Sequence, residues 1–295
     1  MPSIETTAVD NETGKKESLP LEEVIIKDKV MYYDLIIGKT YIVDGTLMYK
    51  LTNKPVLVNG KEVKASKEFI PTSRNGFLEL LFTVPGSVVR GKETVVFEDL
   101  YKDGKLITFH RDIHDKAQTT RTTNPRIKTT LMEVGTGAKE FLPLDKLIHL
   151  VDRIEYFDLV LGIKMRFDLV LMNSVTKEVL KDANGKELTA SLEFTPETKD
   201  GVAEVFITVN AKDLRGISPV AFETLSDISV EGKVRKVAEH KDFNDKGQTV
   251  DILKKPEKPE TGDSGVALFG AMTIISTLGL IFTFITIKNK KGSLD

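Results

Sequence analysis

The sequence predicts an all-β protein: two tandem immunoglobulin-like β-sandwiches, followed by a linker and a single C-terminal transmembrane helix. Three observations lead to this fold class. The chain repeats itself with a period near 125 residues, it alternates polar and apolar residues between turn signals, and residues 266–287 form a long uncharged run. With 295 residues the chain is long enough for two domains, each with its own core.

The repeat consists of matching short segments in the two halves of the chain. The matching pairs are Tyr33–Leu35 with Phe157–Leu159, Asn59–Glu62 with Asn184–Glu187, Val95–Leu100 with Val220–Leu225, and His110–Thr119 with His240–Thr249. We therefore expect repeat 1 at residues 1–122 and repeat 2 at residues 123–253.

Each repeat is expected to consist of short strands. Residues 39–48 and 201–209 alternate in polarity and are rich in β-branched and aromatic residues, a pattern typical of strands. The pairs Asn59–Gly60 and Asn184–Gly185 are hairpin-turn signals. Many short strands in about 120 residues are typical of an antiparallel sandwich of the immunoglobulin type.

Composition excludes several classes of function. The net charge of −2 argues against a nucleic-acid-binding protein, which needs a surplus of Lys and Arg to neutralise phosphates. The absence of cysteine excludes disulfides, zinc–thiolate sites and cysteine nucleophiles. Since the chain has only four histidines, we expect no metal site and no cofactor.

The carboxyl end predicts a membrane anchor. Residues 266–287 carry no charge, and 22 residues rising about 1.5 Å each can cross a bilayer core of about 30 Å. Three lysines follow in residues 288–295, and by the positive-inside rule this basic tail stays in the cytoplasm. Everything before residue 266 is then expected outside the cell.

The segment between the repeats and this anchor, residues 254–265, is rich in proline and charge, so we expect an extended linker. Within it, Lys258–Gly262 resembles the LPxTG sorting signal of Gram-positive surface proteins, with lysine where leucine is usual. The resemblance implies that a sortase cleaves between Thr261 and Gly262 and joins the threonine to peptidoglycan. Sortase and the cell wall are therefore the expected partners.

Polar side chains recur at matched places in the two repeats, whereas a duplicated sandwich needs only its core and turns to match. Val220–Glu223 reads VAFE, and Val95–Glu98 reads VVFE. A His-x-Asp-x-x-Asp-Lys-x-Gln-Thr segment follows in both repeats, and an Ile-x-Thr-Thr segment opens both. Together these motifs resemble the VaFE-repeat, or Thr–Gln ester-bond, domains of Gram-positive adhesins.

That resemblance implies an ester between a threonine on the first strand and a glutamine near the last strand of each domain. Carried onto this sequence, the bonds join Thr6 to Gln118 and Thr129 to Gln248. If the strand register is one residue off, Thr7 and Thr130 take their place. The assisting groups in the two repeats are Glu98, His110, Asp115, Glu223, His240 and Asp245.

These residue types suit the chemistry that the family implies. A threonine hydroxyl needs an adjacent base, for which histidine is the natural choice. A carboxylate can orient that histidine, and a buried carboxylic acid can stabilise the oxyanion that forms on the amide. Which of the glutamate and the aspartate has which role stays open at this point. Each domain would react once, on itself, so the protein is not an enzyme in the sense of turnover.

We therefore expect a structural stalk of a cell-wall-anchored adhesin, stabilised against force and proteolysis by the two esters. The alternatives are a stalk with Lys–Asn isopeptide bonds, a ligand-binding adhesin and, last, a surface hydrolase. The opening Met1–Thr6 has no features of a signal peptide, so we interpret the chain as a fragment whose missing upstream domains would bind any host ligand.

Overall fold

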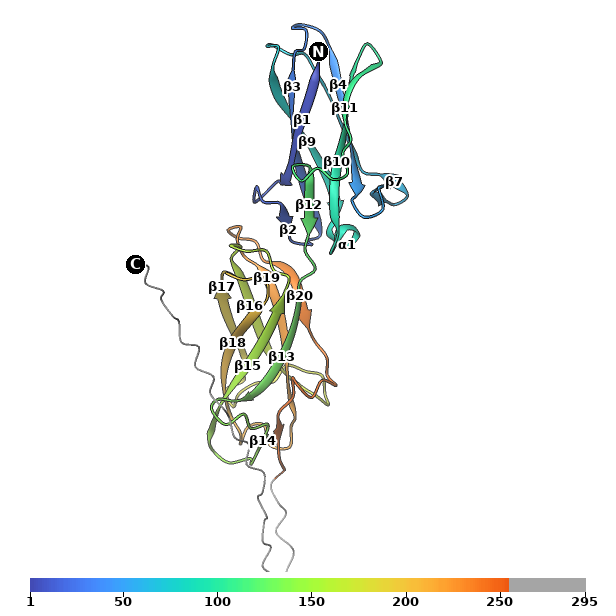
Figure 1. The fold of residues 1–295 in the computed structure, drawn as a ribbon. Helices are drawn as coiled ribbons and strands as arrows, with labels where there is room; N and C mark the ends of the chain where they lie inside the picture. The colour runs from blue at the N-terminus through green and yellow to red at the C-terminus, as the bar shows by residue number, and fades with distance from the viewer. Residues whose placement is uncertain (255–295) are drawn as a thin grey trace, which may run out of the picture. The chain divides into compact units, whose positions relative to one another are not determined.

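The computed structural model describes residues 1–254, and the regular secondary structure of this part of the chain is almost all strand (Figure 1). The all-β prediction is confirmed; the one helix among these residues is the four-residue α1, Gly86–Val89. No helix within residues 1–254 is long and apolar enough to cross a membrane. The predicted transmembrane helix and basic tail, and the sorting residues Thr261 and Gly262, lie outside the described residues.

Repeat 1 has two sheets that enclose one apolar core. The first sheet has the order β1-β3-β9, with β1 Ser3–Asp10, β3 Glu23–Tyr33 and β9 Gly76–Pro85. The second has the order β2-β12-β10-β4-β5, with β11 on β10 and β8 on β4. Its strands are β2 Glu17–Ser18, β12 Thr119–Thr122, β10 Glu93–Lys102, β4 Tyr41–Tyr49, β5 Lys54–Pro55, β11 Lys105–His110 and β8 Lys64–Phe69.

Repeat 2 has the same plan with a separate core. Its sheets have the orders β13-β15-β18 and β17-β16-β19-β20, and β14 pairs with β21 in parallel, as β2 pairs with β12. The strands are β13 Arg126–Glu133, β14 Glu140–Phe141, β15 Leu147–Phe157, β16 Met165–Asn173, β17 Thr189–Phe194, β18 Gly201–Asn210, β19 Pro219–Asp227, β20 Arg235–His240 and β21 Asp251–Ile252.

Strand alternation decides which side chains enter each core. Along β3 every second residue is buried, so that Val24, Ile26, Val30 and Tyr32 face inward between residues that face solvent. The Asn-Gly signal in repeat 1 forms the predicted hairpin, between β6 Leu57–Val58 and β7 Lys61–Glu62. Its two residues have φ of 51° and 77°, the pair of positive values that a type I′ turn requires.

The first and last segments of each repeat lie side by side. In repeat 1 the Ala8 backbone N–H on β1 donates to the Ala117 carbonyl at 3.0 Å, just before β12. In repeat 2 the Leu131 N–H donates to the Gly247 carbonyl at the same distance. This contact places the opening strand next to the segment that carries the predicted glutamine.

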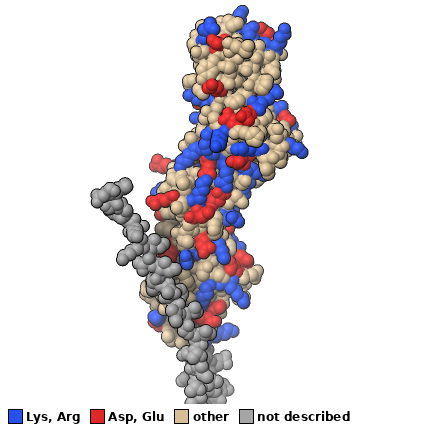
Figure 2. Space-filling view, in the orientation of Figure 1, with Lys and Arg blue, Asp and Glu red and all other residues tan. Residues whose placement is uncertain are grey.

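On the face of the described residues shown in Figure 2, Lys and Arg are interspersed with Asp and Glu. Mixed charge of this kind does not create the single-sign field that concentrates a polyanion at a surface. We therefore look for chemistry in the interior of each repeat.

Candidate functional site

In repeat 1 the predicted threonine and glutamine touch each other inside the sandwich. Thr6 lies on β1 and Gln118 directly before β12, and both side chains are buried. The Gln118 Nε2 donates to the Thr6 Oγ1 at 2.6 Å, although 112 residues separate the two in sequence. The hydroxyl oxygen therefore already lies against the side-chain amide with which it would condense.

The strand register selects one threonine of each pair. Thr6 and Thr129 are 2% and 1% exposed, whereas Thr7 and Thr130 point to the opposite side of their strands and are half-buried. Since alternate residues of a strand face opposite sides, only the first threonine of each pair points into the core. The register left open by the sequence is thus the one with Thr6 and Thr129 inside.

A fully buried glutamate lies between the threonine and the glutamine. Glu223 on β19 accepts hydrogen bonds from the Thr129 Oγ1 at 3.0 Å and from the Gln248 Nε2 at 2.7 Å, both on its Oε2. In repeat 1 the Gln118 Nε2 donates to the Oε2 of Glu98 on β10. The glutamate therefore touches both reacting groups.

The histidine and the aspartate form a second pair beside the first. His110 is the cross-strand partner of Glu98, and His240 is the partner of Glu223. The Nε2 of each histidine lies 3.1 Å (repeat 1) and 3.3 Å (repeat 2) from a carboxylate oxygen of Asp115 and Asp245 respectively. In repeat 2 the other ring nitrogen, Nδ1, is 3.4 Å from the Thr129 hydroxyl.

The aspartate also holds the loop that carries the glutamine. Its second oxygen accepts the backbone N–H two residues on, from Ala117 in repeat 1 and from Gly247 in repeat 2, at 2.6 Å in each. One carboxylate thus links the histidine ring to the residue directly before the glutamine. The geometry separates the two acids: the aspartate contacts the histidine, and the glutamate contacts the threonine and the glutamine.

All ten residues predicted for the two ester sites come together in this way, five in each repeat. Within residues 1–254 no group of three or more His, Asp or Glu side chains is placed to hold a metal ion.

A third acid, which the sequence reasoning missed, lies behind each glutamate. Asp28 and Asp152 are completely buried, and neither carboxylate has a hydrogen-bond partner of ordinary geometry among residues 1–254. They occupy inward positions of β3 and β15, between apolar residues such as Ile26 and Val30. The signal that could have found them is an aspartate on the apolar side of a strand in both repeats.

The two acids of each pair shift each other's titration. Burial raises the pKa of Asp28 and of Asp152 to about 6. Burial, together with the charge of the neighbouring aspartate, raises the pKa of Glu223 to about 10 and that of Glu98 well above its usual range. At neutral pH each glutamate is therefore a neutral acid beside an ionised aspartate.

These shifts predict how stability depends on pH. The aspartates have a pKa of about 6 when folded and an ordinary value of 3.8, so the folded state binds their protons more tightly. Their contribution is complete below pH 4 and is lost as the pH rises through 6, by on the order of 3 kcal/mol per repeat. Urea unfolding between pH 4 and 7 should show this slope on top of the one that the two glutamates contribute, and Asp28→Asn with Asp152→Asn should reduce the total slope. An unchanged slope in that variant would contradict the assignment, and the exposed Asp213→Asn is the control.

A lysine near the start of each repeat was also missed. The Lys139 Nζ donates to the carbonyls of Lys246 and Gly247 at 2.8 and 2.7 Å, directly before Gln248. The Lys16 Nζ donates to the Ala8 carbonyl at 2.5 Å and also to the carbonyl before Gln118. The ammonium thus ties the glutamine segment in place, and burial lowers the pKa of both lysines. Contacts to backbone carbonyls leave no sequence signal.

The two repeats match one family of known domains. The model described as T-Q ester bond containing domain matches residues 2–122 and again residues 125–252. No curated protein matches the chain. Similar solved structures include a bacterial adhesin from Mobiluncus mulieris containing intramolecular disulfide, isopeptide and ester bond cross-links (14% identity, TM-score 0.36, 75% of this chain and 80% of that chain). Another is the C-terminal domain of the AgI/II polypeptide BspA of Streptococcus agalactiae (10% identity, TM-score 0.44, 81% of this chain and 100% of that chain).

Proposed function

Since the chain belongs to the family of T-Q ester bond containing domains, we propose that each repeat closes one ester between a threonine and a glutamine side chain. The bonds join Thr6 to Gln118 and Thr129 to Gln248. The observation that carries the proposal is the buried contact of hydroxyl, amide and neutral glutamate, which occurs in both repeats.

The reaction needs no external reagent. The threonine oxygen attacks the side-chain carbonyl carbon of the glutamine while its proton passes to the histidine. The carbon–nitrogen bond of the amide then breaks, the nitrogen takes up the proton from the histidine, and one ammonia leaves for each ester formed. Because ammonia escapes and is protonated in water, the reverse reaction has no nucleophile at hand.

The contacts support a separate role for each acid. Asp115 and Asp245 orient the histidine and stabilise its charged form, as the acid of a Ser–His–Asp triad does. Glu98 and Glu223 lie against the amide nitrogen and, held neutral, can share a proton with the amide group as charge develops on it. Lys16 and Lys139 position the glutamine through the backbone. Each site acts once and is then consumed, so the reaction is a maturation step of the protein and not turnover.

The mechanical consequence follows from where the bonded residues lie. Thr6 is near the start of repeat 1 and Gln118 near its end, so tension applied to the two ends passes through the ester and bypasses most of the sandwich. The same holds for Thr129 and Gln248 in repeat 2. We infer a load-bearing, protease-resistant stalk segment of a surface adhesin.

The C-terminal signals support the same location. A sortase that cleaves between Thr261 and Gly262 would transfer the stalk to peptidoglycan, after the apolar run 266–287 has held it at the membrane. A host ligand, on this proposal, is bound by another part of the adhesin.

Intact-mass spectrometry of the purified, folded chain tests the proposal. We expect a mass two ammonias below that calculated from the sequence. Gln118→Ala should leave a deficit of one ammonia, and Gln118→Ala with Gln248→Ala should leave none. A folded protein with the full calculated mass would refute both bonds, and loss of both deficits in the single variant would refute their independence.

A further inference from the structure

Repeat 2 contacts repeat 1 through Asp158, which lies at the end of repeat 2 that faces repeat 1. Arg121 on β12 donates two hydrogen bonds to the two carboxylate oxygens of Asp158, each at 2.8 Å. The Asn124 backbone N–H donates to the same carboxylate at 2.7 Å. A bidentate arginine contact of this kind sets the geometry as well as the energy of the joint.

An apolar loop of repeat 1 enters the core of repeat 2 beside this contact. Leu19 is 4% exposed and belongs to the core cluster of repeat 2, together with Val160 and Ile163. Leu21 also packs against that cluster. The buried leucine gives the joint an apolar centre next to its ion pair.

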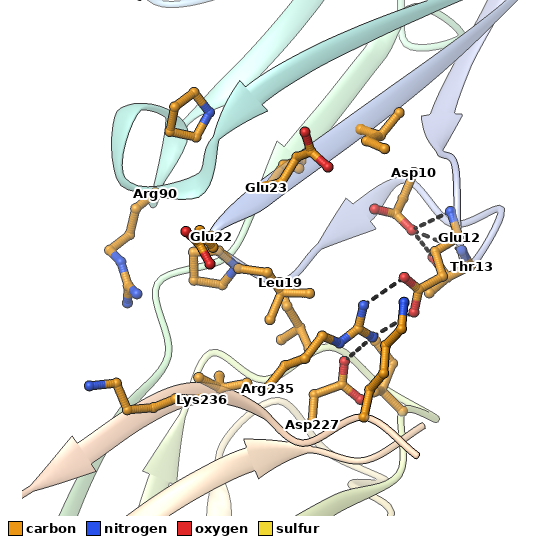
Figure 3. Close-up of a pocket in the computed structure, with 18 of the residues that line it drawn as sticks. Asp10, Glu12, Thr13, Leu19, Glu22, Glu23, Arg90, Asp227, Arg235 and Lys236 are labelled. Atoms are coloured by element: carbon orange, nitrogen blue, oxygen red, sulfur yellow. Dashed lines mark hydrogen bonds and ion pairs between the residues drawn. The ribbon is translucent and has the colours of Figure 1, made fainter. Parts of the chain in front are cut away.

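Further ion pairs surround the apolar centre. Arg235 of repeat 2 donates to both carboxylate oxygens of Glu12 of repeat 1 and is held from behind by Asp227, as Figure 3 shows. Lys199 of repeat 2 contacts Glu17 of repeat 1. Repeat 2 therefore contributes two cations, one aspartate and an apolar patch to the joint. Repeat 1 contributes two glutamates, an arginine and a leucine that contact them.

The opposite end of repeat 1 is built in the same way. Asp34 and Asp158 both have positive φ, 57° and 59°. The backbone N–H of each donates to the same kind of partner, the side-chain oxygen of Asn75 at 3.0 Å for Asp34 and of Asp200 at 2.8 Å for Asp158. The Met1 nitrogen donates to Asp34 as the Asn124 nitrogen donates to Asp158. These two ends are therefore equivalent surfaces.

What differs between the two ends is that, within residues 1–254, only one is covered. Ile36 is 57% exposed, whereas Val160, two residues after the equivalent aspartate, is 1% exposed. Ile37 is also exposed. The cations are present as well, because Arg74, which donates to Asp34 at 3.1 Å, stands where repeat 2 has Lys199, and Lys105 stands where it has Arg235.

We propose that this end of repeat 1 is a docking surface for a further domain of the same construction. We define the surface by Asp34, Ile36, Ile37, Arg74 and Lys105. The domain that fits it presents an arginine to the aspartate, a leucine loop to the two isoleucines and carboxylates to the two cations, as repeat 1 does for repeat 2.

A second copy of this chain, docking through the far end of repeat 2, fits less well. That end has exposed leucines at 142 and 144, the counterparts of Leu19 and Leu21. The counterpart of Arg121, however, is Asp251, since each pairs with the equivalent glutamate across the short parallel ladder. Docking would bring Asp251 against Asp34, and like charges in contact disfavour a partner.

Thiol labelling can test the proposal, because the chain has no cysteine of its own. Ile36→Cys is introduced into the full chain and into a three-repeat chain, in which a copy of residues 1–125 precedes Ser3 of the full chain. The rate of reaction with a water-soluble maleimide is measured in both. We expect labelling to slow by at least about tenfold in the three-repeat chain, because the docked state must open before the thiol reacts. Arg121→Glu in the added copy should restore most of the rate.

Two further cysteine variants serve as controls. Val160→Cys should be slow in both chains, which shows that the natural joint is intact, and the exposed Val175→Cys should be fast in both. Equal labelling of Ile36→Cys in the two chains would overturn the proposal. Labelling of the two-repeat chain that slows as its concentration rises would also overturn it, since the occupant would then be a second copy.

Discussion

Replacing Thr6 and Thr129 with valine is expected to lower the free energy of unfolding by about 4 to 5 kcal/mol per repeat. Valine keeps the shape of threonine but has no hydroxyl to esterify. The ester in repeat 1 closes a loop of 112 residues (118 − 6) and that in repeat 2 a loop of 119 (248 − 129). Closing such loops removes conformational entropy from the unfolded chain, and the variant recovers it. Guanidinium unfolding of the parent and the variant measures the difference.

Thr7→Val with Thr130→Val is the matched control. These neighbours are half-buried on the other side of the same strands, so the control variant should keep both mass deficits and nearly all of its stability. If the first variant unfolds at the same denaturant concentration as the control, the sandwiches owe their stability to packing alone. The two esters would then add nothing to the free energy of unfolding.

The residues that sequence reasoning found are those whose spacing recurs in both repeats. Threonine, glutamate, histidine, aspartate and glutamine each have a matched position, and the fold brings all of them together. The all-β class followed from alternation and turn signals, and the Asn59–Gly60 hairpin formed as expected. These features are local in sequence, which is why a single sequence can reveal them.

The features that were missed depend on tertiary contacts. Asp28 acquires its raised pKa only from burial beside Glu98, a residue on another strand. Lys16 contacts backbone carbonyls, which no sequence motif reveals. Leu19 belongs to repeat 1 but packs into the core of repeat 2. The division of labour between glutamate and aspartate was open for the same reason, because it depends on which carboxylate faces the amide.

Glu223→Gln is expected to slow ester formation in repeat 2 by about 10²- to 10⁴-fold, the usual contribution of a positioned general acid. Glutamine keeps the size of the side chain and can still accept from the Thr129 hydroxyl, but it has no acidic proton to share with the amide group as charge develops on it. The neutral state of Glu223, with its pKa of about 10, is what the substitution removes. The variant should therefore be purified with a deficit of one ammonia, which comes from repeat 1.

Incubating that variant and following its intact mass measures the residual rate directly. Glu98→Gln is the reciprocal control: in this variant the ester should form in repeat 2 at the normal rate and only slowly in repeat 1. Above pH 10 the parent glutamate itself loses its proton. In parent chain that is purified unfolded, before it has reacted, and then refolded, ester formation in repeat 2 should therefore also slow above this pH, while the variant shows no such step. A Glu223→Gln chain that matures as fast as the parent would mean that the glutamate serves only to align the hydroxyl with the amide, and the histidine–aspartate pair would then carry the chemistry alone.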